Sequence, residues 1–385
     1  MRLVGNRVLL TLVAAGALAA WALPFLTRAP NRLVTGVGIR LAQLADPWAG
    51  VLLLPAVLLA CGIVLPQSRR TLVVVAIAAT LLLGGLVWLA GAQAASLAAA
   101  APPAARISLG GGFWLLALCA WLAAVDAIER LRVSPAARTL AGIAVLMPVV
   151  ALAAAGELAA LSLAREYAGR RDVFATALVQ HVAIVAAALL PTVSIGVPLG
   201  IAAFRRARWR GPVFAVLNAI ETVPSLALFG LLLTPLALLA SALPGLREAG
   251  VGGIGVAPAV LALTLYSLLP VVRGTVAGLT QVPQSAVEAA TGMGMSAGRI
   301  FRKIEWPLAF PVLLAGVRIA AVQAVGLTVV AALIGAGGLG ALVFQGLASS
   351  ALDLVLLGVA PVIALSVAVD AGFRLLARRR VPVSA

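Results

Sequence analysis

Long apolar runs with few charges recur along the chain, and they restrict the fold more than any other feature of the sequence. Each run is roughly 18 to 27 residues long and rich in Ala, Leu and Val. In hydrocarbon, only helices and closed barrels satisfy their own backbone groups, and these runs lack the period-two alternation of barrel strands. Only 10% of the 385 residues are charged, which leaves too little polar surface for a water-soluble domain. The sequence therefore predicts an all-α, polytopic membrane protein.

The apolar runs predict about ten transmembrane helices in two regions. An N-terminal membrane extension, residues 1–165, holds about five helices, and a C-terminal region, residues 166–385, holds five more. The first run could be mistaken for a signal peptide, but it is longer than a usual signal-peptide core and is predicted to be a retained helix. The predicted spans are 8–26, 48–66, 71–97, 111–127, 139–160, 177–203, 213–240, 256–279, 307–333 and 352–374.

The positive charges give an orientation. The net charge of +16 comes from short basic clusters between apolar runs, without the interleaved aromatic residues or the basic helix face that would indicate nucleic-acid binding. Most of these clusters fall in the segments that face the cytoplasm if both termini are cytoplasmic, and the basic tail at Arg378, Arg379 and Arg380 fits that arrangement. We expect a multi-pass protein of the bacterial inner membrane that contacts membrane lipid and binds no nucleic acid.

One cytoplasmic segment, residues 280–306, is longer than the other loops on that side. Ser285 and Glu288 have the spacing of a capping box, which predicts a short helix, and Gly292 and Gly294 could end that helix and turn the backbone sharply. The segment is therefore predicted to form a compact helical elbow, whose small side chains allow close approach by another protein. An amphipathic helix lying on the membrane is an equally good interpretation of the spacing alone.

This segment resembles the signature of binding-protein-dependent ABC importer permeases. That signature is EAA, three residues, G, nine residues, I, one residue, LP. The spacing agrees at every anchor, and the one departure is Trp306 in place of Leu. In that family the segment is a coupling helix that docks in a cleft of the ATPase subunit. The residues that match the signature are Glu288, Ala289, Ala290, Gly294, Ile304 and Pro307.

The resemblance extends over roughly residues 170–378, which look like the five-helix core of type I importer permeases. The stretches 221–227 and 334–340 are most similar to permeases for the osmoprotectants glycine betaine, choline or carnitine, and the N-terminal extension looks like that of a subgroup of those systems. An amino-acid permease, for example one for methionine, is the alternative. The resemblance implies alternating access, a separate ATPase, a periplasmic or lipid-anchored substrate-binding protein, and a second permease subunit, either identical or paralogous.

Catalytic chemistry is not predicted for this chain. Lys303 is the only lysine and is followed by Ile304, so the chain lacks the Gly-Lys-Ser/Thr sequence of a Walker A loop. We expect it to bind no cofactor, ATP being used by the partner ATPase. His181 is the only histidine, and no cluster of metal-ligating residues accompanies it. The glycine-rich stretch Gly335 to Gly340 follows a membrane span and predicts a turn or a re-entrant element.

A few polar residues fall inside the predicted spans, where charge is costly. Glu221 precedes Pro224, which can loosen its helix and free a carbonyl, and Arg318 shares a later span with Gln323 and Thr328. These five residues are candidates for the translocation path or a gate. A structural pair between helices explains the charges equally well. An ion-coupled secondary transporter is a less favoured alternative, because most of the acids lie near span ends.

Overall fold

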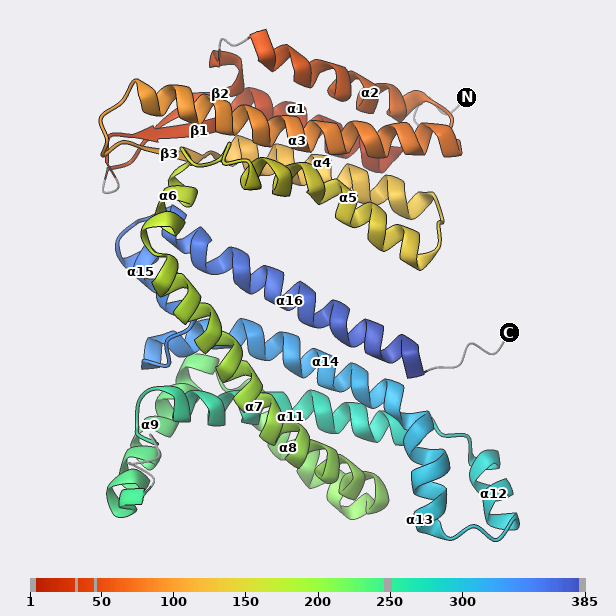
Figure 1. The fold of residues 1–385 in the computed structure, drawn as a ribbon. Helices are drawn as coiled ribbons and strands as arrows, with labels where there is room; N and C mark the ends of the chain where they lie inside the picture. The colour runs from red at the N-terminus through yellow and green to blue at the C-terminus, as the bar shows by residue number, and fades with distance from the viewer. Residues whose placement is uncertain (1–4, 32–33, 45–46, 246–250, 381–385) are drawn as a thin grey trace. The chain divides into compact units, whose positions relative to one another are not determined.

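The computed structural model describes residues 5–31, 34–44, 47–245 and 251–380, so both termini lie outside the described residues. The chain divides into two compact units, residues 1–169 and 170–385. Within the described residues, eight helices are long and apolar enough to cross a membrane, and shorter apolar helices accompany them. The predicted polytopic, helical fold is confirmed, with one small sheet that the sequence analysis did not predict (Figure 1).

The N-terminal unit is a helical bundle with a three-stranded sheet. Its central helix is α3, which packs on α2, α4 and α5. The elements in chain order are α1 (Arg7–Ala22), β1 (Pro24–Ala29), β2 (Val37–Arg40), the 3-10 helices η1 (Leu41–Gln43) and η2 (Pro47–Leu52), α2 (Leu53–Val64), α3 (Arg69–Ala99), β3 (Arg106–Leu109), α4 (Gly111–Arg130), α5 (Pro135–Ala154) and α6 (Ser162–Gly169).

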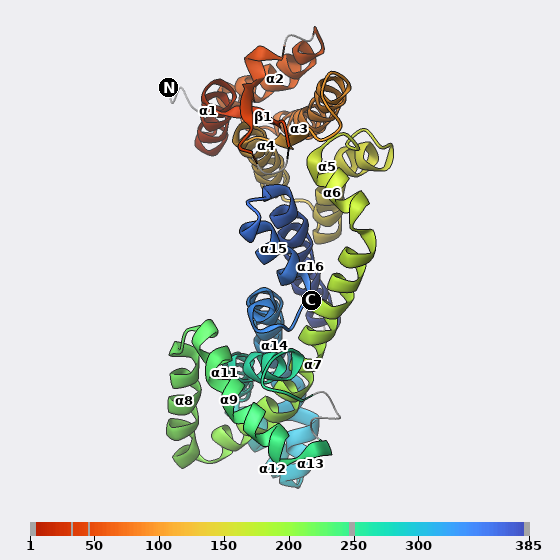
Figure 2. The same ribbon diagram turned by 90° about the vertical axis from the view of Figure 1, so that its left-hand side faces the viewer.

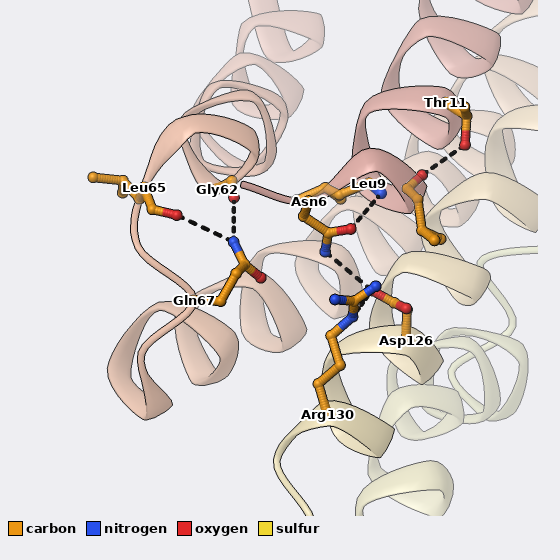
Figure 3. Close-up of polar contacts among 9 residues, drawn as sticks. Asn6, Leu9, Thr11, Gly62, Leu65, Gln67, Asp126 and Arg130 are labelled. Atoms are coloured by element: carbon orange, nitrogen blue, oxygen red, sulfur yellow. Dashed lines mark hydrogen bonds and ion pairs between the residues drawn. The ribbon is translucent and has the colours of Figure 1, made fainter. Parts of the chain in front are cut away.

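The helix starts of this unit follow from local polar chemistry. Ser68 and Ser134 accept the amide hydrogens of the residues three positions later, at the beginning of α3 and α5. Asn6 does the same for α1, with a distance of 3.0 Å from the Leu9 amide to Asn6 Oδ1, while Asn6 Nδ2 donates to Asp126 of α4 (Figure 3). Arg130 also donates to Asp126, so one polar cluster joins the start of α1 to α4.

The sheet is a small addition to the confirmed helical fold, and it shortens the predicted first span, 8–26. Pro24 has no amide hydrogen and a fixed φ, so α1 ends at Ala22 and the apolar sequence continues as strand β1. The strand order is β2-β1-β3, with both neighbours antiparallel to β1 and Thr27 opposite Gly38 and Ser108. Only glycine fits at position 110 beside β1, because a Cβ atom there would clash with the Pro24 carbonyl oxygen at 2.2 Å.

The C-terminal unit is built around α11, which is buried over most of its length and packs on α7 and α14 (Figures 1 and 2). Small residues allow this close packing: a Cβ atom on Gly316 of α14 would lie 2.5 Å from the Pro270 carbonyl oxygen of α11. The elements are α7 (Arg171–Arg205), α8 (Ala207–Thr222), α9 (Ser225–Ala242), α11 (Val256–Thr280), α12 (Gln284–Gly292), α13 (Ala297–Ile300), the π-helix η3 (Phe301–Glu305), α14 (Trp306–Ala331), the 3-10 helix η4 (Ala332–Ile334), α15 (Leu339–Ala348) and α16 (Leu352–Arg380).

Candidate functional site

The candidate coupling segment begins with α12, a nine-residue helix. The predicted capping box is wrong: Pro283 occupies the N-cap, and Ser285 lies inside the helix with no side-chain capping bond. The predicted turn after the helix is confirmed, since α12 ends at Gly292 and Gly294 has a φ of 77°. The Met295 amide reaches back 3.1 Å to the Ala290 carbonyl, the pattern of a glycine-ended helix.

The three residues of the Glu-Ala-Ala sequence face different surroundings. Glu288 and Ala289 are exposed, while Ala290 is fully buried in a helix that packs on α13 and η3. Ala290 therefore holds the short helix to the segment that follows it, and its two predecessors form the face that another protein could contact. The exposed neighbours Thr291 and Gly292 extend that face with small side chains.

The second arm of the elbow runs without interruption into the bundle. Helix α13, the π-helix and α14 form one continuous helical rod that extends through η4, residues 297–334. Ile304 is half-buried and Pro307 is exposed at the start of α14, where its missing amide hydrogen costs little. Trp306, the departure from the family pattern, packs between Phe301 and Phe310 with ring centroids 6.0 and 6.3 Å away. The larger side chain is thus accommodated by an aromatic row.

The end of α7 braces this rod. Arg205 Nη2 donates to Glu305 Oε2 at 2.8 Å, and the Arg205 guanidinium lies 5.2 Å from the centre of the Phe301 ring. The side chain of Glu305 is 14% exposed and that of Arg205 is 44% exposed, so the pair is partly shielded from water. The turn between α7 and α8 therefore lies at the same end of this unit as α12 and α13 (Figure 1).

Glu221 and Pro224 lie where the predicted span 213–240 breaks into two helices. Helix α8 ends at Thr222 and α9 begins at Ser225, because Pro224 cannot donate to the helical ladder. The Val223 carbonyl at the break accepts the hydroxyl of Tyr266 from α11. Glu221 and Pro224 themselves are exposed on the surface of the unit.

The polar residues of α14 separate into different environments. Arg318 Nη1 lies 3.6 Å from Asp370 Oδ1 on α16, which is the interhelical pair considered as one of the two interpretations. Thr328 is fully buried and donates to the Ala324 carbonyl of its own helix at 2.7 Å, while Gln323 is half-buried. The structure does not gather Glu221, Arg318, Gln323 and Thr328 into one pocket among the pockets described.

The glycine-rich stretch is held by a neighbouring helix that the sequence analysis did not single out. Gln180 of α7 donates to the Ala336 carbonyl at 2.9 Å and accepts from the Gly338 amide at 3.1 Å. Gly337 and Gly338 both have positive φ, and a Cβ atom on Gly337 would lie 2.4 Å from Gln180. The helix that follows, α15, has 10 residues and is about 15 Å long, too short to cross a membrane.

His181, the neighbour of Gln180, is fully buried. One of its ring nitrogens, Nε2, lies 3.1 Å from the Val325 carbonyl of α14. His181 therefore packs inside the bundle between α7 and α14. Within the described ranges, no group of three or more His, Cys, Asp or Glu side chains could hold a metal ion.

Comparison with known proteins agrees with this geometry. Residues 193–382 match the family described as "Binding-protein-dependent transport system inner membrane component", and residues 6–164 match "ABC transporter permease YehY, N-terminal domain". The osmoprotectant import permease protein OsmW of Salmonella typhimurium is 38% identical over 191 residues, which cover 50% of this chain and 84% of that protein. This chain belongs to the binding-protein-dependent ABC importer permeases.

Other permeases show the same relationship. The glycine betaine/carnitine/choline permease OpuCD of Bacillus subtilis is 36% identical, with 46% of this chain and 70% of that protein covered. A chain of the MetNI methionine ABC transporter superposes with a TM-score of 0.50 and 19% identity, covering 56% of this chain and 99% of that chain. The last comparison shows that the C-terminal unit has the fold of such permeases.

Proposed function

We propose that this permease is the membrane-spanning subunit of an ABC importer for a small osmoprotectant such as glycine betaine, choline or carnitine. Its elbow at residues 280–306 docks on a separate ATPase, which uses the ATP, and the chain itself binds no cofactor. The observation that carries the proposal is an exposed short helix, α12, that is joined by a tight turn to a helical rod running without a break into the bundle. Both termini and the elbow would then lie in the cytoplasm of the bacterial cell.

The elbow has the mechanical properties that such a role needs. The outward face of α12, with Glu288 and Ala289, is available for contact, while Ala290 fixes the helix to the second arm. A displacement of α12 would move the rod that contains α14 as one body, because no non-helical break separates its helical segments. The Arg205–Glu305 pair would carry part of that displacement to α7.

The packing of α14 directs the movement into the core of the unit. Gly316 and Gly274 bring the backbones of α14 and α11 into contact, so a shift of one helix cannot be absorbed by flexible side chains. The Tyr266 contact with the break at Pro224 is made by the same helix, α11, which packs on α8 and α9 as well as on α14. We infer that Glu221 and Pro224, with Arg318, Gln323 and Thr328 on α14, belong to the path or gate that alternating access opens and closes.

The substrate class rests on the names of the relatives. Those relatives are named for osmoprotectant, glycine betaine, carnitine and choline transport. The structural neighbour from the methionine transporter supports the fold alone at 19% identity. A substrate-binding protein, periplasmic or lipid-anchored, would deliver the cargo, and a second permease subunit would complete the pathway, since five core helices cannot enclose one.

Uptake by reconstituted vesicles tests the proposal. The full chain is combined with its ATPase and binding protein, and labelled glycine betaine, choline, carnitine and methionine are compared. We expect ATP-dependent uptake of an osmoprotectant and a reduction of about tenfold or more in the Ala289→Trp variant, because a large side chain prevents close docking. Ala207→Trp, the same change at an exposed position at the same end of the unit, should leave uptake intact.

Two outcomes would contradict the proposal in different ways. Uptake driven by an ion gradient without the ATPase would identify a secondary transporter. ATP-dependent uptake of methionine in preference to the osmoprotectants would keep the importer and replace its cargo.

A further inference from the structure

A cavity of about 240 Å³ lies between α14 and α16 of the C-terminal unit. Two guanidinium groups, Arg318 and Arg374, line it together with apolar side chains that include Leu314 and Phe373. Both helices belong to the predicted membrane-spanning segments. Placing two cationic side chains in a membrane-spanning segment costs free energy unless polar or anionic groups pair with them.

The charges around the cavity do not balance. Asp370 is the carboxylate described beside these two arginines, and it lies 2.5 Å from Arg374 Nη2 and 3.6 Å from Arg318 Nη1. The second distance is that of an ion pair and is too long for a hydrogen bond. One carboxylate thus serves two guanidinium groups, and the cluster keeps a net charge of +1.

Arg318 has donor capacity beyond this pair. A guanidinium carries five N–H donors, and among the residues that the structure describes Asp370 is the only polar partner given for Arg318. Its side chain is 32% exposed and lines the cavity between the two membrane helices. Donors in such a place favour an anion that accepts from both guanidinium groups, as a phosphate does.

The depth of the cluster indicates where that anion comes from. Asp370 precedes Ala377, the end of the apolar span of α16, by about two helical turns, or about 10 Å. The cavity lining continues to Ala377 itself, so the cavity extends from the hydrocarbon to the end of the span, where the headgroup region begins. Leu314, Phe373 and Pro311 supply apolar walls next to the guanidinium groups. Basic cavities between membrane helices near the cytoplasmic surface are suited to anionic lipid headgroups.

We propose that this cavity binds the phosphodiester headgroup of an anionic membrane lipid, with Arg318 and Arg374 holding the phosphate. Asp370 positions both guanidinium groups and limits the site to one excess positive charge, which matches a singly charged phosphodiester. The apolar wall receives the glycerol and the first part of the acyl chains. Bound lipid would join α14, the helix continuous with the coupling elbow, to α16. The binding itself does not depend on the proposed transport function.

Lipid binding to the purified full chain in neutral detergent tests this proposal. Phosphatidylglycerol and phosphatidylcholine are titrated and the bound lipid is counted by native mass spectrometry. We expect one tight phosphatidylglycerol site whose affinity falls about fivefold to tenfold in Arg318→Gln. That variant keeps the Arg374–Asp370 pair. Arg210→Gln, which removes an exposed arginine on α8, away from the cavity lining, should leave the affinity unchanged.

A second variant separates loss of the site from loss of the fold. Ala315→Phe fills the cavity without changing any charge, and it should displace phosphatidylglycerol while the unfolding temperature stays near that of the wild type. Equal affinity for both lipids, or equal loss in Arg210→Gln, would overturn the proposal. So would competition by millimolar inorganic phosphate at the same site, which would identify a soluble anion as the ligand. Unchanged lipid binding in Arg318→Gln would also overturn the proposal, and loss of substrate uptake in that variant would leave Arg318 with the path or gate role alone.

Discussion

The two units of this permease use their polar residues in different ways. In the N-terminal unit, a cavity of about 270 Å³ among α1 to α4 is lined by apolar side chains, and Asn6 serves the fold by capping α1 and bonding to Asp126. In the C-terminal unit, charged groups line the cavity between α14 and α16, and α12 exposes Glu288. Asn6 and Asp126 of the first unit thus bond to each other, whereas the second unit leaves Glu288 exposed and two guanidinium groups beside one carboxylate.

The burial of individual helices shows the same contrast within the C-terminal unit. Most of α11 is buried, while α9 buries only Leu228, Phe229 and Ala240 along its length. A helix with so little burial in its own protomer must face lipid or another subunit. Stability should therefore depend on the contacts of α11, and function on the faces that the protomer leaves exposed. Four substitutions test this division, beginning with the largest effect.

Gly316→Leu should disrupt the C-terminal unit. Any side chain at this position meets the Pro270 carbonyl at 2.5 Å and the Gly274 Cα atom at 3.0 Å, and backbone cannot move aside as a flexible side chain can. We expect a loss of about 3 kcal/mol or more, seen as a large drop in unfolding temperature or in the yield of folded protein. Gly326→Leu, on the same helix with open space around it, is the matched control. Equal stability of the two variants would show that the α11–α14 contact is not tight.

Gln180→Leu should loosen the glycine-rich stretch. The change removes one hydrogen bond to the Ala336 carbonyl and one from the Gly338 amide, at a cost of about 2 kcal/mol. Hydrogen exchange of residues 334–340 should accelerate, while exchange in the elbow stays unchanged. Ser194→Ala, on the same helix with only a bond to its own turn, is the control. Unchanged exchange in residues 334–340 would show that Gln180 does not stabilise this stretch.

Asn6→Ala should weaken the N-terminal unit alone. It removes the cap of α1 and the bond to Asp126, and we expect a loss of about 1 to 2 kcal/mol. Thr11→Ala is the control, because the Thr11 hydroxyl is exposed and bonds only within its own helix. Faster proteolysis of residues 5–31 in Asn6→Ala should not be accompanied by loss of lipid binding at Arg318. A comparable effect in Thr11→Ala would contradict the special role of Asn6.

Arg205→Gln should have the smallest effect on stability. The Arg205–Glu305 pair is partly exposed, so its loss should cost about 0.5 kcal/mol or less. Transmission from the elbow to α7 should nevertheless weaken, which would lower uptake per ATP hydrolysed. Arg208→Gln, exposed in the following turn, is the control. A fall in uptake of equal size in both variants would indicate a general effect of charge.

The sequence predicted the helices well wherever hydropathy alone decides the structure. Continuous apolar runs identified the spans around α3, α4, α11, α14 and α16. The break between α8 and α9 was missed because hydropathy continues across Pro224, and β1 was missed because apolar residues continue past Pro24. In both cases the missing amide hydrogen of proline ended a helix that composition would have extended.

The candidate site was predicted in part. The spacing of small residues located the elbow and the turn at Gly294, since a positive φ there needs glycine. The capping box failed because Pro283, with its extended ψ, begins the helix two residues before Ser285 could cap it. Gln180 and its loop partners are more than 150 residues apart, and no local pattern encodes such a contact. A structural pair between helices was one of two interpretations of Arg318, but the sequence did not indicate Asp370 as its partner.

Cysteine labelling of α12 tests the docking of the elbow most directly. In a background with Cys61→Ala and Cys119→Ala, which removes both native cysteines, Ala289→Cys is introduced in the full chain and Ala207→Cys serves as the control. In membranes that contain the ATPase, we predict a cross-link from position 289 to that subunit and no reaction with an impermeant maleimide added outside intact cells. Labelling of position 289 from outside, with no cross-link to the ATPase, would contradict the account.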